Sequence, residues 1–207
     1  INRAPAKTQA ALFEVMEEKQ ITIDGTTYKM KEPFVVLATQ NPIEQEGTYR
    51  LPEAQLDRFL FKINVDYPNA NEEFDIILKE QALENTTKSS KVKTVISGEK
   101  IIEFRNLVNQ IKIEENLLKY IANIVVNTRS NSFLYLGASP RASIAILGAS
   151  KAFAAIEGRD FVTPDDIKRA TIPVLQHRVI VTPEREMEGV TSKQIIEQII
   201  EAVEIPR

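Results

Sequence analysis

The chain has 207 residues (23.4 kDa), of which 43% are hydrophobic and 27% charged, as is usual for one sizeable globular domain or two small ones. Its formal net charge of −3 gives no general attraction to nucleic acid or to an anionic membrane, and the absence of cysteine excludes disulfides and thiolate chemistry. The longest apolar runs are far shorter than the roughly 20 residues that span a bilayer. The lack of cysteine is compatible with a reducing cytoplasm, where we expect the protein. Because the chain begins with Ile1 inside a continuing motif, we also expect a piece of a longer protein.

The first third of the chain predicts an α/β unit over residues 1–66. Apolar residues recur at helical spacing from Pro5 to Lys19, and Asp24-Gly25 between two alternating runs is typical of a β-hairpin. The continuous apolar run 34–38 predicts a strand buried on both faces of a parallel sheet. Alternation over 59–65 predicts a second strand of that sheet.

The remainder, residues 67–207, predicts an all-helical domain. Amphipathic helices are indicated at about 71–82, 97–111, 117–125, 139–156, 163–176 and 195–200. Ser139-Pro140 and Thr163-Pro164 each combine a capping residue with proline at the first helical position. Asn71 is expected to cap the first of these helices. The polar stretch 85–91 predicts a surface loop.

Asn41 is the first candidate functional residue, because it follows the expected strand 34–38. In open α/β sheets, ligands bind beyond the carboxyl ends of the strands, where an amide can orient a water molecule or contact a phosphate. The alternative is a turn residue before Pro42.

Arg58 is the second candidate and lies at the end of a short helix expected over 52–58. An arginine held there offers a rigid, permanently charged fork to a phosphate across an interface, as arginine fingers do in phosphoryl transfer. The alternative is a local ion pair with Asp57 or Glu53, which contributes little at a surface.

Arg141 is the third candidate and falls in the first turn of the helix that begins at Ser139-Pro140. A helix N-terminus carries partial positive charge, so a cation there is disfavoured unless an anion lies nearby. A phosphate bound at this end of the helix would supply that anion. The alternative is a side chain that points to solvent.

Other chemistry is weakly indicated. His177 is the only histidine, which excludes a histidine-based metal cluster, and a structural role before Arg178 is the simpler interpretation. Asp165 and Asp166 lie in a helix's first turn, where carboxylates are favoured. The seven glycines form no Gly-x-x-x-x-Gly-Lys-Ser/Thr loop, and no apolar strand ends in an acidic pair suited to Mg²⁺. The chain alone is therefore expected not to hydrolyse ATP.

The three candidates lie in stretches that resemble the MoxR branch of the AAA+ ATPases. Residues 1–9 (INRAPAKTQ) resemble the segment after that family's Walker B motif. Residues 34–58 resemble its sensor 1 and arginine-finger region, reading FVVLATQNPIEQEGTYRLPEAQLDR. Residues 136–142 (LGASPRA) resemble sensor 2, and 158–167 (GRDFVTPDDI) a lid segment. The likeness covers nearly the whole chain in order and is weakest between 84 and 116.

This resemblance implies the C-terminal part of a AAA+ P-loop ATPase core over 1–66, followed by a helical lid domain over 67–207. It makes Asn41 sensor 1 and Arg141 sensor 2, both on the subunit's own ATP. It makes Arg58 the finger that contacts the neighbouring subunit's ATP. The implied cofactors are ATP and Mg²⁺, bound mainly by segments that this chain lacks.

The resemblance also implies a homo-hexameric ring that works with von Willebrand factor A domain proteins in chaperone-like maturation, including metal insertion. The hairpin 21–31 is then a point of client contact, and Arg50 departs from the family's usual proline near the subunit interface. Two other functions stay open. A non-catalytic interaction module derived from the lid would leave strand edges unpaired. A DNA-remodelling AAA+ protein fits poorly with the net charge of −3.

Overall fold

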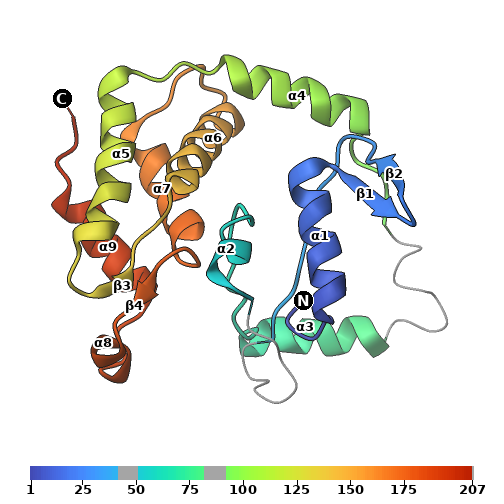
Figure 1. Cartoon of the computed structure of the whole chain (residues 1–207), viewed down its shortest axis with the longest axis horizontal. Coiled ribbons are helices and arrows are strands. Elements are labelled where there is room, and N and C mark those ends of the chain that lie inside the picture. Colours follow the sequence, from blue (N-terminus) through green and yellow to red (C-terminus); the bar gives the residue numbers. More distant parts are fainter. Residues whose placement is uncertain (42–50, 82–91, 207) are drawn as a thin grey trace.

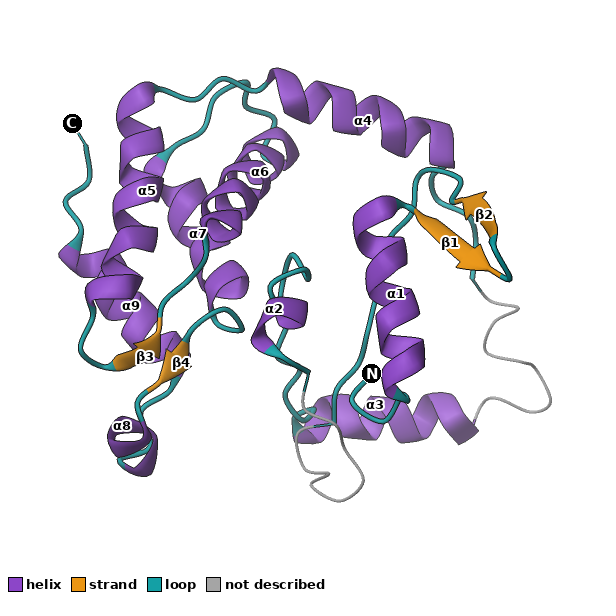
Figure 2. Cartoon of the chain, viewed as in Figure 1, coloured by secondary structure: helices purple, strands orange, loops and turns teal. Residues whose placement is uncertain are grey.

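The computed structural model describes residues 1–41, 51–81 and 92–206, so Arg50 and the predicted loop 85–91 lie outside it. Its helices are α1 (Ala6–Glu18), α2 (Glu53–Leu56), α3 (Ala70–Gln81), α4 (Gly98–Gln110), α5 (Glu115–Ser130), α6 (Pro140–Ile156), α7 (Pro164–Leu175), α8 (Pro183–Met187) and α9 (Ser192–Ala202) (Figure 1). Its strands are β1 (Gln20–Ile23), β2 (Thr26–Lys29), β3 (Leu134–Leu136) and β4 (Ile180–Val181). They form two antiparallel pairs, β1 with β2 and β3 with β4, in an otherwise helical structure (Figure 2).

The predicted hairpin is present directly after α1. Lys19 ends α1 in the left-handed conformation (φ 51°), and β1 follows at the next residue. Asp24 and Gly25 both have positive φ, 48° and 76°, which matches the twist of a two-residue hairpin turn. Apolar side chains on both strands of the hairpin are exposed, Ile23 by 53% and Tyr28 by 54%.

The two strands predicted for a parallel sheet are not formed in the described residues. Segment 34–38 runs without regular structure, with Val35 72% and Leu37 91% exposed, and the prediction of a buried strand there is wrong. Segment 59–65 likewise forms no strand, and its Ile63 is 76% exposed. A parallel strand needs a neighbour for its hydrogen-bond ladder and cover for both faces, and the described residues supply neither.

The main hydrophobic core lies in the helices of the C-terminal half. The buried residues of this core all lie between positions 111 and 203, where α5, α6, α7 and α9 pack against one another. Ile124, Ile146, Ile167 and Ile195 have no exposed surface, and each such burial stabilises the fold by about 1.5–3 kcal/mol. This confirms the helical periodicity predicted for these segments. No helix in the described ranges is long and apolar enough to cross a membrane.

The helix starts follow the predicted caps with one exception. Ser139 caps α6 by accepting the backbone N–H of Arg141 at 3.2 Å, and Thr163 opens α7 in a capping box. The cap predicted at Asn71 is wrong, because α3 begins one residue earlier. The side chain of Asn69 accepts the backbone N–H of Asn71 at 3.0 Å and therefore takes the capping role.

Helix α4 connects the hairpin region to the C-terminal helices. Arg105 of α4 pairs with Glu32, which follows the hairpin, at 2.8 Å. At the other end of α4, the ammonium of Lys151 on α6 donates to the carbonyl of Asn109 at 3.2 Å. In Figure 1, α4 accordingly crosses the top of the molecule between these two parts.

The backbone at Gly137 packs directly on α5 and so sets where α6 begins. Thr128 of α5 accepts the N–H of Ala138 at 2.9 Å, and Arg129 donates to the Ala138 carbonyl at 2.8 Å. A Cβ at residue 137 would lie 2.6 Å from the Cα of Arg129 and 2.7 Å from the carbonyl oxygen of Thr128. Only glycine allows this approach, because backbone atoms cannot move aside as a flexible side chain can.

We predict that Gly137→Ala lowers the free energy of unfolding by about 1–3 kcal/mol through this clash. Gly148→Ala is the matched control, because Gly148 lies within α6 and a Cβ there meets nothing within 4 Å. It should instead raise stability by about 0.5–1 kcal/mol through helix propensity. Urea unfolding of both variants checks this, and equal effects at the two positions would refute the steric argument.

Candidate functional site

The segment 57–62 lies between α1 and the C-terminal helices. The ring of Phe59 meets Phe13 of α1 edge-on, with centroids 6.4 Å apart. The ring of Phe61 stacks on Phe153 of α6 with centroids 6.5 Å apart. These aromatic contacts place the residues that follow α2 at the junction between α1 and the C-terminal helices.

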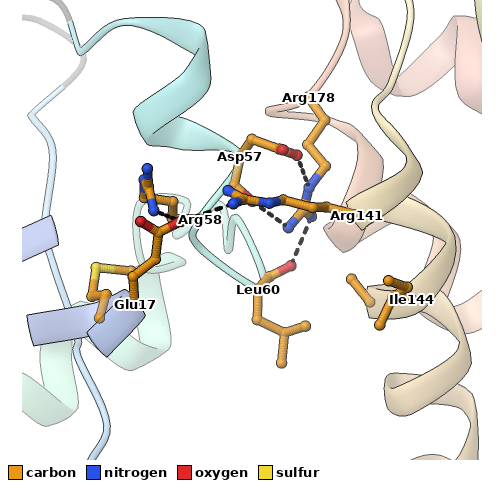
Figure 3. A pocket seen from close by; sticks show the side chains of 9 residues that line it. Glu17, Asp57, Arg58, Leu60, Arg141, Ile144 and Arg178 are labelled. Atoms are coloured by element: carbon orange, nitrogen blue, oxygen red, sulfur yellow. Dashed lines mark hydrogen bonds and ion pairs between the residues drawn. The ribbon is translucent and has the colours of Figure 1, made fainter. Parts of the chain in front are cut away.

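A shallow pocket of about 370 Å³ opens at this junction. It is lined by Met16, Glu17, Asp57, Arg58, Leu60, Arg141, Ile144, Ala145 and Arg178. Figure 3 shows three arginines and two carboxylates of this set facing one another from α1, the end of α2, the start of α6 and the end of α7. The pocket thus gathers two of the three predicted functional residues, Arg58 and Arg141.

Arg58 and Arg141 converge on one carboxylate oxygen. Glu17 Oε1 forms an ion pair with Arg58 and accepts from Arg141 Nη2 at 2.8 Å (Figure 3). The Arg58 side chain is 23% exposed, with its Nε and Nη1 buried, whereas that of Arg141 is 52% exposed, so Arg141 is the more accessible of the two. Two guanidinium groups on one oxygen form a strong binding site for a carboxylate or a phosphate.

Glu17 and Arg141 each lie at the unfavourable end of a helix. Glu17 is in the last turn of α1, where the helix dipole disfavours an anion, and Arg141 is in the first turn of α6, where it disfavours a cation. Their ion pair cancels both penalties. The sequence argument that Arg141 needs a nearby anion is therefore satisfied here by a side chain of the same protein, and Arg141 does not point free into solvent.

Arg178 is the most buried charge of the pocket, with 3% of its side chain exposed. Its Nε donates to Asp57 Oδ1 at 2.9 Å, and its terminal nitrogens donate to the carbonyls of Asp57, Phe59 and Leu60 at 3.0, 2.6 and 3.1 Å. Burial lowers the pKa of Arg178, and the hydrogen bond and charge of Asp57 oppose that effect. The network keeps the guanidinium charged and saturated with acceptors.

Asp57 also engages Ser139, the cap of α6. The Ser139 hydroxyl donates to Asp57 Oδ2 at 2.8 Å while its oxygen accepts the Arg141 N–H. This engagement explains why the local alternative for Arg58, an ion pair with Asp57, is not what the structure shows. Asp57 is taken by Arg178 and Ser139, and Arg58 reaches Glu17 instead.

Asn41 lies away from these arginines. The nitrogen of Ile1 donates to the carbonyl of Thr39 at 2.7 Å, which places Asn41 near the start of α1, whereas Glu17 is in its last turn. The two ends of a 13-residue helix are about 18 Å apart. The structure therefore brings Arg58 and Arg141 together and leaves Asn41 at the opposite end of α1.

Sequence reasoning did not identify Glu17, Asp57, Ser139 and Arg178 as parts of one site. Glu17 could have been noticed, because a carboxylate in the last turn of a helix needs a nearby cation. Arg178 also donates to the carbonyl of Val174 four residues earlier, but its partners in the site, Asp57, Phe59 and Leu60, are more than a hundred residues away in the sequence.

His177 has the structural role predicted for it. Its Nε2 lies 2.9 Å from the Phe59 carbonyl, and its Nδ1 is buried without a hydrogen-bond partner among the described residues. Burial lowers the pKa of His177 to about 4, with the Phe59 carbonyl opposing the shift. The ring is therefore neutral at pH 7, and it acts as a donor to the segment 57–62.

The pocket fits phosphate groups better than metal ions. Its arginines supply charged donors, whereas no group of three or more potential metal ligands occurs among the described residues. Mg²⁺ prefers carboxylate oxygens, and the carboxylates of the described lining, Glu17 and Asp57, are already paired with arginines.

Known proteins resemble both the first part of the chain and its C-terminal helices. Residues 1–61 match the family model "ATPase family associated with various cellular activities (AAA)", and residues 126–199 match the AAA lid domain. The chain is 44% identical over its whole length to the uncharacterized protein YeaC of Bacillus subtilis, of which it covers 63%. It is 38% identical, again over its whole length, to Chaperone MoxR1 of Mycobacterium tuberculosis, of which it covers 56%.

A crystal structure of a protein assigned as an ATPase from Cytophaga hutchinsonii superimposes with a TM-score of 0.91 at 43% identity. All of this chain is covered, and 64% of that one. The fold and the matched regions are those of a AAA+ ATPase, with part of its α/β core followed by its helical lid, which confirms the predicted fold class. Within that class the chain is similar over its whole length to a protein of the MoxR family. It spans between 56% and 64% of the length of these relatives.

We predict that acidification destabilises the chain through His177. The folded-state pKa of about 4 lies below the unfolded value of 6.5, so the unfolded state binds more protons between these pH values, and stability falls as the pH drops through this window. The loss should reach up to about 3 kcal/mol near pH 4. His177→Gln, which cannot titrate but can still donate to Phe59, should unfold with a shallower pH dependence. Parallel pH profiles for the two proteins would contradict the assignment.

Proposed function

We propose that the protein is an ATP-hydrolysing motor of the MoxR type, in which Arg58 and Arg141 contact the γ-phosphate of a neighbouring subunit's ATP. The observation that carries the proposal is the convergence of both guanidinium groups on Glu17 Oε1. Glu17 then occupies the place of the phosphate. The two arginines exchange its carboxylate for phosphate oxygens when subunits meet.

The chemistry suits phosphoryl transfer. Negative charge spreads over the equatorial oxygens of the transferred group in the transition state, and fixed cations at those oxygens lower the barrier. Arg58 and Arg141 are permanently charged, and each offers a planar fork of N–H donors. Arg141 is the more exposed of the two side chains. Arg178 is saturated by acceptors of its own chain and contributes position rather than a phosphate contact.

The geometry favours one nucleotide for both arginines. The family resemblance assigned Arg141 to its own subunit's ATP and Arg58 to the neighbour's. Since the two share a carboxylate, we propose instead that both serve the neighbour's ATP. Asn41, at the other end of α1, would then act as sensor 1 on the subunit's own ATP, orienting the attacking water.

The larger assembly is part of the same proposal. An arginine that acts on the next subunit's nucleotide requires a heterologous interface, and closing such interfaces gives a ring, which we take to be a hexamer as in the family. Residues 1–66 would form the core portion and 67–207 the lid. One relative is named as a chaperone, which supports a role in remodelling or maturing partner complexes. Partners with a von Willebrand factor A domain, metal insertion and a cytoplasmic location are proposed from family resemblance.

The first test is Arg58→Ala in the full-length protein. We expect kcat for ATP hydrolysis to fall by about 10³-fold or more, with nucleotide binding retained, because a finger acts on transition-state charge. Arg185→Ala is the control, since Arg185 is a surface arginine of α8 paired with Glu188 at 2.6 Å. Normal turnover in Arg58→Ala would remove the finger assignment.

Mixed rings test which nucleotide Arg141 contacts. In the first mixture, Asn41→Ala and Arg141→Ala subunits are combined in equal amounts. If the two residues serve different nucleotides, an interface is active when the ATP-binding subunit keeps Asn41 and its neighbour keeps Arg141. Turnover should then return at about one quarter of the interfaces (one half times one half). Arg58→Ala mixed with Arg141→Ala should regain none, because every interface would lack one of the two arginines. The opposite pattern of recovery would return Arg141 to its own subunit's ATP.

A further inference from the structure

Asp57 links the segment that carries Arg58 to the helix start that carries Arg141. Its Oδ1 accepts from Arg178 at 2.9 Å and its Oδ2 accepts from the Ser139 hydroxyl at 2.8 Å. Asp57 directly precedes Arg58, and Ser139 lies two residues before Arg141. The link thus reaches within two residues of each phosphate-facing arginine.

Arg178 anchors this link through its shape as well as its charge. One guanidinium donates to the Asp57 carboxylate and to the carbonyls of Asp57, Phe59 and Leu60, on both sides of Arg58. A planar group with five N–H donors can serve such a set at once, whereas a lysine ammonium has three donors at a single point. The backbone around Arg58 is consequently held at a set distance from the end of α7.

We propose that Arg178 and Ser139 are positioning residues that hold Arg58 and Arg141 as one rigid unit. The inference rests on the proposed function, since it presupposes that this pair contacts ATP. Movement of the lid then carries the finger with it, because α6, α7 and the segment 57–62 are tied through one carboxylate. The lid and Arg58 therefore move together.

This coupling matters for turnover because two cations stabilise one transferred group only when both are placed together. A displacement of about 1 Å at a reacting centre can cost about 10²-fold in rate. Without the link, each arginine would still be present and charged, and ATP binding by the rest of the site would be unaffected. The expected signature is therefore a loss in kcat with little change in KM.

Steady-state ATP hydrolysis by the full-length protein tests the coupling. Arg178→Lys should lower kcat by about 10²-fold and change KM for ATP by less than about threefold. In an Arg58→Ala background, the same substitution should lower kcat by much less than 10²-fold, because one of the two arginines that it positions is already absent. A purely structural role would instead reduce both backgrounds equally.

Ser139→Gly provides a second variant that keeps the fold if Arg178→Lys does not. Glycine caps a helix only slightly less well than serine, so α6 should still begin correctly while the hydroxyl link is lost. We expect kcat to fall by about tenfold, and Ser139→Thr, which keeps the hydroxyl, to remain within about twofold of the natural protein. Ser97→Gly is the matched control, because Ser97 caps α4 far from Asp57 by accepting the Lys100 N–H at 3.3 Å.

Unchanged kcat in Ser139→Gly, or a loss that multiplies fully with that of Arg58→Ala, would overturn the coupling and leave the proposed function standing. Unchanged kcat in Arg58→Ala itself would overturn the proposed function, and the coupling with it. Loss in Ser139→Gly and in Ser97→Gly alike would reduce the effect to helix capping and would also overturn the coupling.

Discussion

The ion pair between Arg178 and Asp57 holds the junction on which the candidate site depends. Both groups are withdrawn from water, with 3% and 16% of their side chains exposed. Desolvation of two charges usually offsets most of their attraction, so such a pair is favourable only when the remaining donors and acceptors are satisfied. Here they are, by the backbone carbonyls of Asp57, Phe59, Leu60 and Val174 and by the Ser139 hydroxyl. Loss of one partner would strand the other, a penalty of about 3–5 kcal/mol.

This network explains how segment 57–62 is ordered without a β-ladder. In a strand, Phe59 and Phe61 would lie on one face, because they are two positions apart. Here they contact different helices, Phe59 the ring of Phe13 on α1 and Phe61 the ring of Phe153 on α6. Hydrogen bonds to Arg178 and His177 take the place of ladder bonds for the Phe59 carbonyl. The two faces of the segment are therefore covered by helices, and its backbone by side chains from the end of α7.

The site itself is a balance of charges placed where helices disfavour them. Glu17 and Arg141 would each destabilise its own helix terminus if alone, and together they neutralise one another. Arg141 stays half exposed in this pair, and under the proposed function a phosphate with more negative charge displaces the carboxylate.

The sequence by itself determined the local features. The hairpin at Asp24-Gly25, the cap at Ser139 and the periodic helices of the lid are each governed by residues within a few positions, and those predictions were confirmed. It also singled out Arg58 and Arg141 through motif and helix position. The predicted strands failed because burial of 34–38 depends on neighbouring strands that no local pattern supplies.

Only the tertiary structure decided which charges meet. Arg178 lies 121 positions from Asp57 in sequence, and Arg141 lies 124 from Glu17, so no spacing rule relates them. Their pairing depends on how α1, α6 and α7 pack, which is set by non-directional burial across the whole core. That packing placed Arg58 beside Arg141 and left Asn41 a helix length away, a separation that follows from the geometry of α1 and not from any motif.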